Sequence, residues 1–125
     1  MVYALGIDLV EITRIEKIIK RWDDRFIRRV FTKREIEYCR KKPHAAQHYA
    51  ARFAAKEAFL KCLGLGIMNG VALHQIEVIN DRGGQPHLVI YDRAKAMLDT
   101  IHITNIHISI THSISHAAAV VALEV

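Results

Sequence analysis

The sequence has little of several residue types and patterns that would place it in a specialised class of protein. Its 125 residues include two cysteines, Cys39 and Cys62, which are not in a CxxC spacing, so we expect reduced thiols and no disulfide. No apolar run approaches the roughly 20 residues that a membrane-spanning helix needs. The first residues lack the basic start and the small-residue cleavage site of a signal peptide. We therefore expect one cytoplasmic domain over residues 1–125 with no membrane segment.

Aromatic side chains are also few, with one Trp, four Tyr and four Phe, whereas positive charge is plentiful in the first half. Residues 1–61 contain 15 Lys/Arg and 8 Asp/Glu, a net charge of +7, while residues 62–125 contain 3 and 5, a net charge of −2. The first half therefore favours an anionic partner, which could be a nucleic acid, an acidic protein or a phosphorylated small molecule; the alternative is a solvated basic surface. The lack of a recognised base-stacking or base-reading motif argues against nucleic acid.

The N-terminal segment is predicted to be a strand followed by an amphipathic helix. Residues 2–12 alternate so that Asp8 shares one face with apolar residues. Asp8 is then either a functional carboxylate or an ordinary turn or cap residue. Thr13 and Glu16 have the spacing of a capping box, so we expect the helix to begin at Thr13 and to include Trp22.

This first helix has a basic side opposite its apolar stripe. The side carries Arg14 and Arg21, and Arg25 joins it if the helix continues past Asp23. Such a row is either a solvated face or a docking ridge for an acidic helix, because guanidinium groups form paired hydrogen bonds with carboxylates. A second capping box, Thr32 with Glu35, predicts another helix that ends before Pro43.

A long central helix is predicted from the region of His44 to Leu63, with a glycine cap at Gly64. Glu57 lies beside its apolar stripe, which consists of Phe53, Leu60 and Gly64, and the flanking positions are Arg52, Lys56 and Lys61. The simplest interpretation of Glu57 is a salt bridge with Lys61 one turn later. A carboxylate set among apolar residues is also a candidate for metal binding.

The second half has the alternation of an antiparallel sheet with one short helix. We expect strands at residues 75–80, 87–91, 106–111 and 117–125, a turn at residues 81–84 and a helix at residues 93–101.

Asp8 and Glu57 are two carboxylates on different predicted elements, each in an apolar setting. Mg²⁺ prefers one or two carboxylates, with waters and substrate phosphates completing its coordination. Lys61, one turn beyond Glu57, could neutralise a phosphate on the same metal. These residue types favour a magnesium-dependent phosphoryl or phosphodiester site.

Four motifs, in order along the chain, resemble those of the holo-[acyl-carrier-protein] synthases within the 4′-phosphopantetheinyl transferase superfamily. They are residues Gly6 to Ile15, Arg52 to Ile67 with its Phe-x-x-Lys-Glu-x-x-x-Lys pattern, Asp81 to Pro86, and Ser109 to Ser113. The resemblance covers nearly the whole chain. It implies a compact α+β fold of antiparallel strands packed by helices, assembled as a homotrimer with active sites between subunits.

The resemblance also implies the reaction. Such enzymes transfer the 4′-phosphopantetheine arm of coenzyme A to a serine of apo acyl carrier protein and release adenosine 3′,5′-bisphosphate. It assigns Asp8 and Glu57 to Mg²⁺ and Lys61 to the pyrophosphate, with Glu57 a candidate base for the serine. Coenzyme A contacts are expected from Arg52, Lys61, Gly64, Pro86 and His112, and carrier docking from Arg14, Arg21 and Arg25. The segment Arg40 to Lys42 matches positions that bind the 3′-phosphate.

Two departures from the family pattern are Leu65, where Thr is usual, and the hairpin tip Ser113 to His116, which is less charged than usual. We expect both to affect affinity rather than reaction type. Two alternatives remain: a basic nucleic-acid-binding module, and a coenzyme A or metal sensor without turnover.

Overall fold

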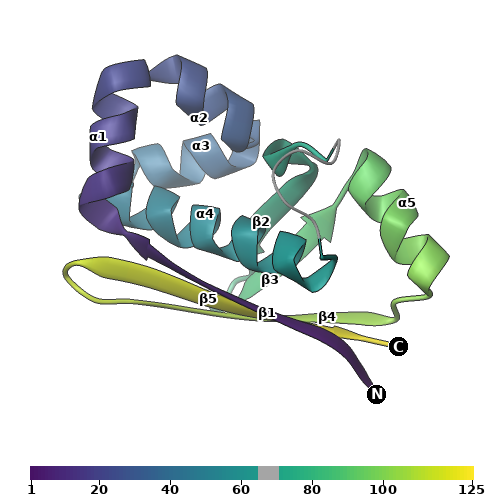
Figure 1. Cartoon of the computed structure of the whole chain (residues 1–125). Helices are drawn as coiled ribbons and strands as arrows, with labels where there is room; N and C mark the ends of the chain where they lie inside the picture. Colours follow the sequence, from purple (N-terminus) through teal and green to yellow (C-terminus); the bar gives the residue numbers. More distant parts are fainter. Residues whose placement is uncertain (65–70) are drawn as a thin grey trace.

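A three-stranded antiparallel sheet carries the longest helix on one of its faces (Figure 1). The computed structural model describes residues 1–64 and 71–125. The sheet has the order β1-β5-β4, and β2 and β3 form a separate hairpin. The elements, in chain order, are β1 (Val2–Glu11), α1 (Ile12–Trp22), α2 (Asp24–Val30), α3 (Lys33–Arg40), α4 (Ala45–Cys62), η1 (Leu73–Gln75), β2 (Ile76–Asn80), β3 (Pro86–Ile90), α5 (Asp92–Ile101), β4 (Asn105–His112) and β5 (His116–Glu124). This confirms the predicted α+β class.

Helix α4 packs unusually close to strand β1. The alternation of β1 turns Gly6, Asp8 and Val10 towards the helix, as predicted. A Cβ atom placed on Gly6 would lie 1.9 Å from the main-chain oxygen of Ala58, so only glycine fits at this crossing. Alanines on α4, including the fully buried Ala54 and Ala58, permit the same approach. The contact fixes the position of Asp8 along the axis of α4.

The other face of the sheet points away from the helices (Figure 1). Leu5, Ile7 and Leu9 of β1 are 67%, 66% and 66% exposed on it, and Tyr3 and Val120 add to the same apolar surface. Because Asp8 alternates with Ile7 and Leu9, the apolar surface lies directly behind the strand that carries the carboxylate.

Helix boundaries mostly agree with the sequence-based expectations. Thr32 and Glu35 form the predicted capping box at the start of α3, and Gly64, with φ of 69°, follows the end of α4 as expected. The capping box predicted for Thr13 and Glu16 is wrong. The backbone turns directly from β1 into α1 at Ile12, and the Thr13 hydroxyl donates to Glu11 instead.

Strands and helix of the second half lie within two residues of their predicted positions at each end. In the part of the chain that the structure describes, no helix is long and apolar enough to cross a membrane. Cys39 and Cys62 are free and buried, which agrees with the expectation of reduced thiols. Leu65, one of the two departures from the family pattern, lies outside the described residues.

Two of the cationic side chains that flank the Glu57 stripe on α4 are buried. Lys56 is fully buried and Arg52 is 4% exposed, since α3 and β2 cover that side of the helix. The Lys56 ammonium donates to Glu35 Oε1 at 2.6 Å, to Ile76 O at 2.5 Å and to Leu73 O at 3.1 Å. Lys56 therefore joins α4 to α3, η1 and β2.

Candidate active site

Asp8 of β1 and Lys61 of α4 meet where the helix crosses the strand. The Lys61 ammonium donates to Asp8 Oδ1 at 3.0 Å and to the main-chain oxygen of Ile7 at 2.8 Å. In the described structure Lys61 therefore pairs with Asp8, and the expected Glu57–Lys61 helix salt bridge is absent. This brings three of the predicted site residues, Asp8, Glu57 and Lys61, to one side of α4.

Glu57 has a partly buried carboxylate with one unpaired oxygen. Its Oε1 atom is buried and has no hydrogen-bond partner among the described residues. Burial raises the pKa of Glu57 above its usual value, and the Asp8 carboxylate raises it further, while Lys61 and Arg14 act in the opposite direction. An orphaned oxygen beside a second carboxylate is a suitable pair of ligands for a hard divalent cation.

This pair matches a two-carboxylate magnesium site and no larger protein cage. Within residues 1–64 and 71–125, no three His, Cys, Asp or Glu side chains converge on one point. Mg²⁺ commonly keeps several waters and takes further oxygens from substrate phosphates, so two carboxylates are enough on the protein side. Asp8 and Glu57 therefore fit the Mg²⁺ ion that the sequence motifs imply.

A cavity of about 790 Å³ opens beside Glu57, between α1, α2, α4 and η1. Its walls are mostly apolar, and its cationic lining residues are Arg14, Arg28 and Arg29. Sequence reasoning found Arg14 but missed Arg28 and Arg29. The signal was present in the cationic run of residues 24–30, which the structure shows as the short helix α2.

The predicted docking residues Arg14, Arg21 and Arg25 come from two helices rather than from one ridge. Asp23, with φ of 49°, separates α1 from α2, so Arg25 belongs to α2. Arg21 lies 5.4 Å over the ring of Trp22, and Arg25 lines a hollow with Trp22, Phe26 and Arg29. All three arginines are exposed. Of these three, Arg14 lines the cavity beside Glu57 together with Arg28 and Arg29, whereas Arg25 shares a separate hollow with Arg29.

A second cluster of predicted residues lies on another side of α4. Arg52 donates to Asn80 Oδ1 at 2.7 Å, and Asn80 is the register partner of Pro86 in the β2–β3 hairpin. The Gln47 amide contacts the ring of His112, with 2.9 Å between the two Nε2 atoms. Arg52, Pro86 and His112 are all predicted to contact coenzyme A. Arg52 lies on α4 itself, and Asn80 and Gln47 connect this helix to Pro86 and His112.

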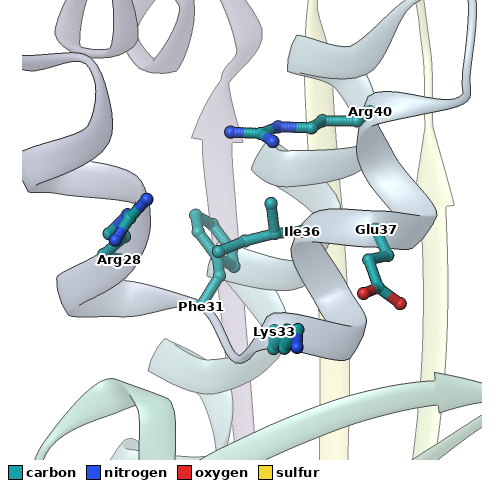
Figure 2. A pocket seen from close by; sticks show the side chains of 6 residues that line it. All are labelled: Arg28, Phe31, Lys33, Ile36, Glu37 and Arg40. Carbon is teal, nitrogen blue, oxygen red and sulfur yellow. The ribbon is translucent and has the colours of Figure 1, made fainter.

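Two of the three cations in the segment Arg40 to Lys42 have different neighbours. Arg40 pairs with Asp24 at 3.7 Å and lines a separate hollow of about 420 Å³ between α2 and α3. Figure 2 shows Arg40 and Arg28 on either side of Phe31 and Ile36 in that hollow. Lys42 lies 4.7 Å over the Tyr38 ring, which Arg52 also contacts. Arg40 and Lys42 therefore contact different parts of the molecule.

Comparison with known proteins identifies the family. The model of the 4′-phosphopantetheinyl transferase superfamily matches residues 4–121. The holo-[acyl-carrier-protein] synthase of Syntrophus aciditrophicus (strain SB) is 54% identical over 124 residues, which cover 99% of this chain and 97% of that protein. The chain belongs to the holo-[acyl-carrier-protein] synthases. These are phosphopantetheinyl transferases, so the chain is an enzyme of that class.

Solved structures of holo-[acyl-carrier-protein] synthases share the fold. The Neisseria meningitidis enzyme superposes with a TM-score of 0.91 at 29% identity, covering 99% of each chain. The Helicobacter pylori enzyme, solved in complex with coenzyme A, has a TM-score of 0.84 at 32% identity, covering 96% of this chain and 99% of that one. The family assignment favours the transferase over the nucleic-acid-binding alternative.

Proposed function

We propose that this synthase transfers the 4′-phosphopantetheine group from coenzyme A to a serine of apo acyl carrier protein in a Mg²⁺-dependent reaction. Adenosine 3′,5′-bisphosphate is the second product, and the activated carrier serves fatty acid synthesis in the cytoplasm. The observation that carries the proposal is the orphaned Glu57 oxygen beside Asp8 and Lys61. The Helicobacter pylori relative, crystallised with coenzyme A, supports the choice of donor.

Asp8 and Glu57 would hold Mg²⁺, which when bound neutralises charge on the coenzyme A pyrophosphate during the transfer. Lys61 can leave Asp8 for a phosphate oxygen, because its side chain is 53% exposed and its stem is flexible. Glu57, whose pKa is raised by burial and by Asp8, is the candidate to take the proton from the serine hydroxyl. The serine oxygen then bonds to the phosphorus, and the adenosine bisphosphate leaves.

The coenzyme is proposed to bind at both clusters on α4. Lys61 and Gly64 are proposed for the phosphate end, and Arg52, Pro86 and His112 for the nucleotide end. The carrier protein is proposed to dock on the cationic surface that includes Arg14, Arg21 and Arg25, since acidic helices complement such a surface. Arg14 of that surface also lines the cavity beside Glu57, so a carrier docked there would bring its serine towards the carboxylates.

A homotrimer is proposed as the working assembly. Leu5, Ile7 and Leu9 expose an apolar surface of the kind that monomeric proteins seldom leave in water. Asp8 lies on the reverse side of the same strand, so an interface there would bring a neighbouring subunit close to the metal site. Light scattering should give the mass of three chains, and replacing Ile7 by Lys should shift the protein to the monomer; a monomeric wild-type protein would contradict the assembly.

Mass spectrometry of the carrier protein tests the reaction. Purified protein with Mg²⁺, coenzyme A and apo carrier should add the phosphopantetheine mass to the carrier, and chelation of the metal should stop the addition. Asp8→Asn and Glu57→Gln should each abolish turnover with little loss of folding, while the matched control Glu37→Gln, at an exposed carboxylate of α3, should remain active. An unchanged carrier mass with the wild-type protein would refute the proposal.

A further inference from the structure

The hollow of about 420 Å³ between α2 and α3 has no part in the reaction described above (Figure 2). Arg28 of α2 and Phe31 line one side of it. The other side is one face of α3, whose lining residues recur at a spacing of three or four and are Lys33, Ile36, Glu37 and Arg40. Tyr38 lies two residues from Ile36, which turns a helix by roughly 200°, so its contact with Arg52 is on the opposite side of α3.

Two guanidinium groups of this hollow share one carboxylate without a hydrogen bond to it. Asp24 lies 3.9 Å from Arg28 and 3.7 Å from Arg40, and both distances exceed the usual length of an N–H···O bond. With Lys33 and Glu37, the hollow has three cations and two carboxylates, which leaves one net positive charge. A monoanion complements that charge, and a carboxylate can form the short paired bonds with guanidinium groups that Asp24 does not.

An unpaired hydroxyl lies next to the same group of charges. The Tyr49 ring packs on Phe31, with 4.9 Å between the ring centroids, and Tyr49 is 3% exposed. Its hydroxyl oxygen is buried and has no hydrogen-bond partner among the described residues. Burial raises the pKa of Tyr49 and Cys39 raises it further, whereas the nearby Arg40 charge lowers it. The hydroxyl is therefore a neutral donor close to Arg40, which an anion held by Arg40 can use.

We propose that the hollow between α2 and α3 is a second ligand site, which binds a small carboxylate with an apolar body. The apolar body lies on Phe31 and Ile36, and the carboxylate takes the place of Asp24 between Arg28 and Arg40. The volume of about 420 Å³ is within the roughly 300–1,000 Å³ of typical small-molecule sites. A monocarboxylate with a medium-length acyl chain has both features.

Arg28 connects this site to the cavity beside Glu57, because its side chain lines both. A guanidinium group that binds a carboxylate in the hollow is less available to an acidic carrier at the cavity. The two ligands therefore weaken each other, and by thermodynamic linkage they do so by the same factor. This effect on the carrier rests on the proposed function, whereas the binding of the carboxylate does not.

Calorimetric titration with octanoate measures the binding. Acetate lacks the apolar body and octanamide lacks the charge, so each should bind at least about tenfold more weakly than octanoate. Arg40→Gln should weaken octanoate binding on the order of tenfold, because it removes a charged donor. Ile36→Phe fills the hollow and should abolish binding. Arg93→Gln, at an exposed position on α5, is the matched control and should bind octanoate as the wild type does.

Steady-state kinetics test the connection through Arg28. Saturating octanoate should raise the KM for the carrier by about fivefold or more, and leave kcat and the KM for coenzyme A unchanged. Arg28→Gln should itself raise the KM for the carrier and should remove the effect of octanoate. Ile36→Phe should remove the effect while its KM without octanoate equals that of the wild type. If Ile36→Phe does not fold, Arg40→Gln, at an exposed position, still decides where octanoate binds.

Three results would overturn the inference. Unchanged octanoate binding in Arg40→Gln and Ile36→Phe would place the ligand elsewhere, and octyl phosphate binding more tightly than octanoate would assign the hollow to a phosphomonoester. Bound octanoate that leaves the KM for the carrier unchanged would refute the connection through Arg28. A wild-type protein that modifies the carrier but does not bind octanoate would remove the second site alone. One that binds octanoate but never modifies the carrier would contradict the proposed function alone.

Discussion

Replacing Lys56 by Met tests whether a buried ion pair holds the active-site helix in place. The side chain is fully buried, and its ammonium has three oxygen acceptors, of which Glu35 Oε1 at 2.6 Å is charged. Methionine keeps most of the volume but leaves Glu35 buried without its cation. Removing one partner of a buried pair typically costs about 3–5 kcal/mol, because the remaining charge is uncompensated.

That loss is large relative to the roughly 5–15 kcal/mol that stabilises a typical domain. Urea denaturation at fixed protein concentration should lower the unfolding midpoint by roughly 2 M, for a slope near 2 kcal/mol per molar urea. Lys95→Met is the matched control, because Lys95 makes an equally short ion pair, 2.7 Å to Asp99, on an exposed face of α5. Exposed pairs contribute at most about 1 kcal/mol, so this control should hardly move the midpoint.

A double-mutant cycle with Glu35→Gln isolates the pair. The glutamine keeps the size of the side chain and one of the two acceptor oxygens of Glu35, of which Oε1 now accepts from the Thr32 N–H and Oε2 from the Val78 N–H. Combining both changes should cost clearly less than the sum of the single changes, since neither then leaves a lone buried charge. If Lys56→Met costs no more than Lys95→Met, or if the effects of the two buried changes simply add, the buried pair does not hold α4 as argued.

Three further predictions follow from other contacts. Gly6→Ala should destabilise the protein by several kcal/mol and abolish turnover, because the new methyl would lie 1.9 Å from Ala58 O. Thermal unfolding and the carrier mass assay measure the two effects, and a stable, active variant would show that the contact between β1 and α4 can relax. Burial raises the pKa of the Cys39 thiol from 9.0 to about 12, so its contribution to stability is full below pH 9 and is lost as the pH rises towards 12. The free energy of unfolding, measured between pH 8 and 11, should therefore fall less steeply with pH in Cys39→Ala than in the wild type, and parallel curves would contradict the burial argument. Arg21→Glu should raise the KM for the carrier on the order of tenfold and leave the KM for coenzyme A unchanged, and Arg93→Glu, at an exposed position on α5, is the control. A change confined to the KM for coenzyme A would show that Arg21 does not belong to the docking surface.

Local patterns in the sequence were sufficient where neighbouring residues determine the structure. The alternation of β1 placed Asp8 on the inner face, and the Thr32–Glu35 spacing correctly marked the start of α3. The glycine after Leu63 correctly marked the end of α4. In each case the deciding interactions lie within a few residues of the chain, which is why a pattern could reveal them.

Partners that are distant in the chain decided what the patterns missed. Lys56 has the appearance of a surface residue on a helix, and its burial depends on Glu35 and on two main-chain oxygens of the segment after α4. Helix spacing assigned Lys61 to Glu57, whereas its carboxylate partner, Asp8, is 53 residues away. The contact of Arg52 with the Tyr38 ring is also long-range, since it forms only when α3 packs on α4.

The placement of both clusters on α4 bears on why the proposed enzyme would need more than one chain. Arg52 belongs to the first half of the helix and Glu57 and Lys61 to the second, with roughly 8 Å along the axis between Arg52 and Glu57. They also face different directions, because five residues between Arg52 and Glu57 turn the helix by roughly 140°. Arg52 faces Tyr38 and Asn80, whereas Glu57 faces the cavity beside α1 and α2. A coenzyme whose nucleotide end is bound near Arg52 would have to pass around α4 to reach Asp8 and Glu57 of the same chain. The same two carboxylates of a second chain would be reached more directly. The apolar surface of Leu5, Ile7 and Leu9 adjoins Asp8 and is where that second chain would pack.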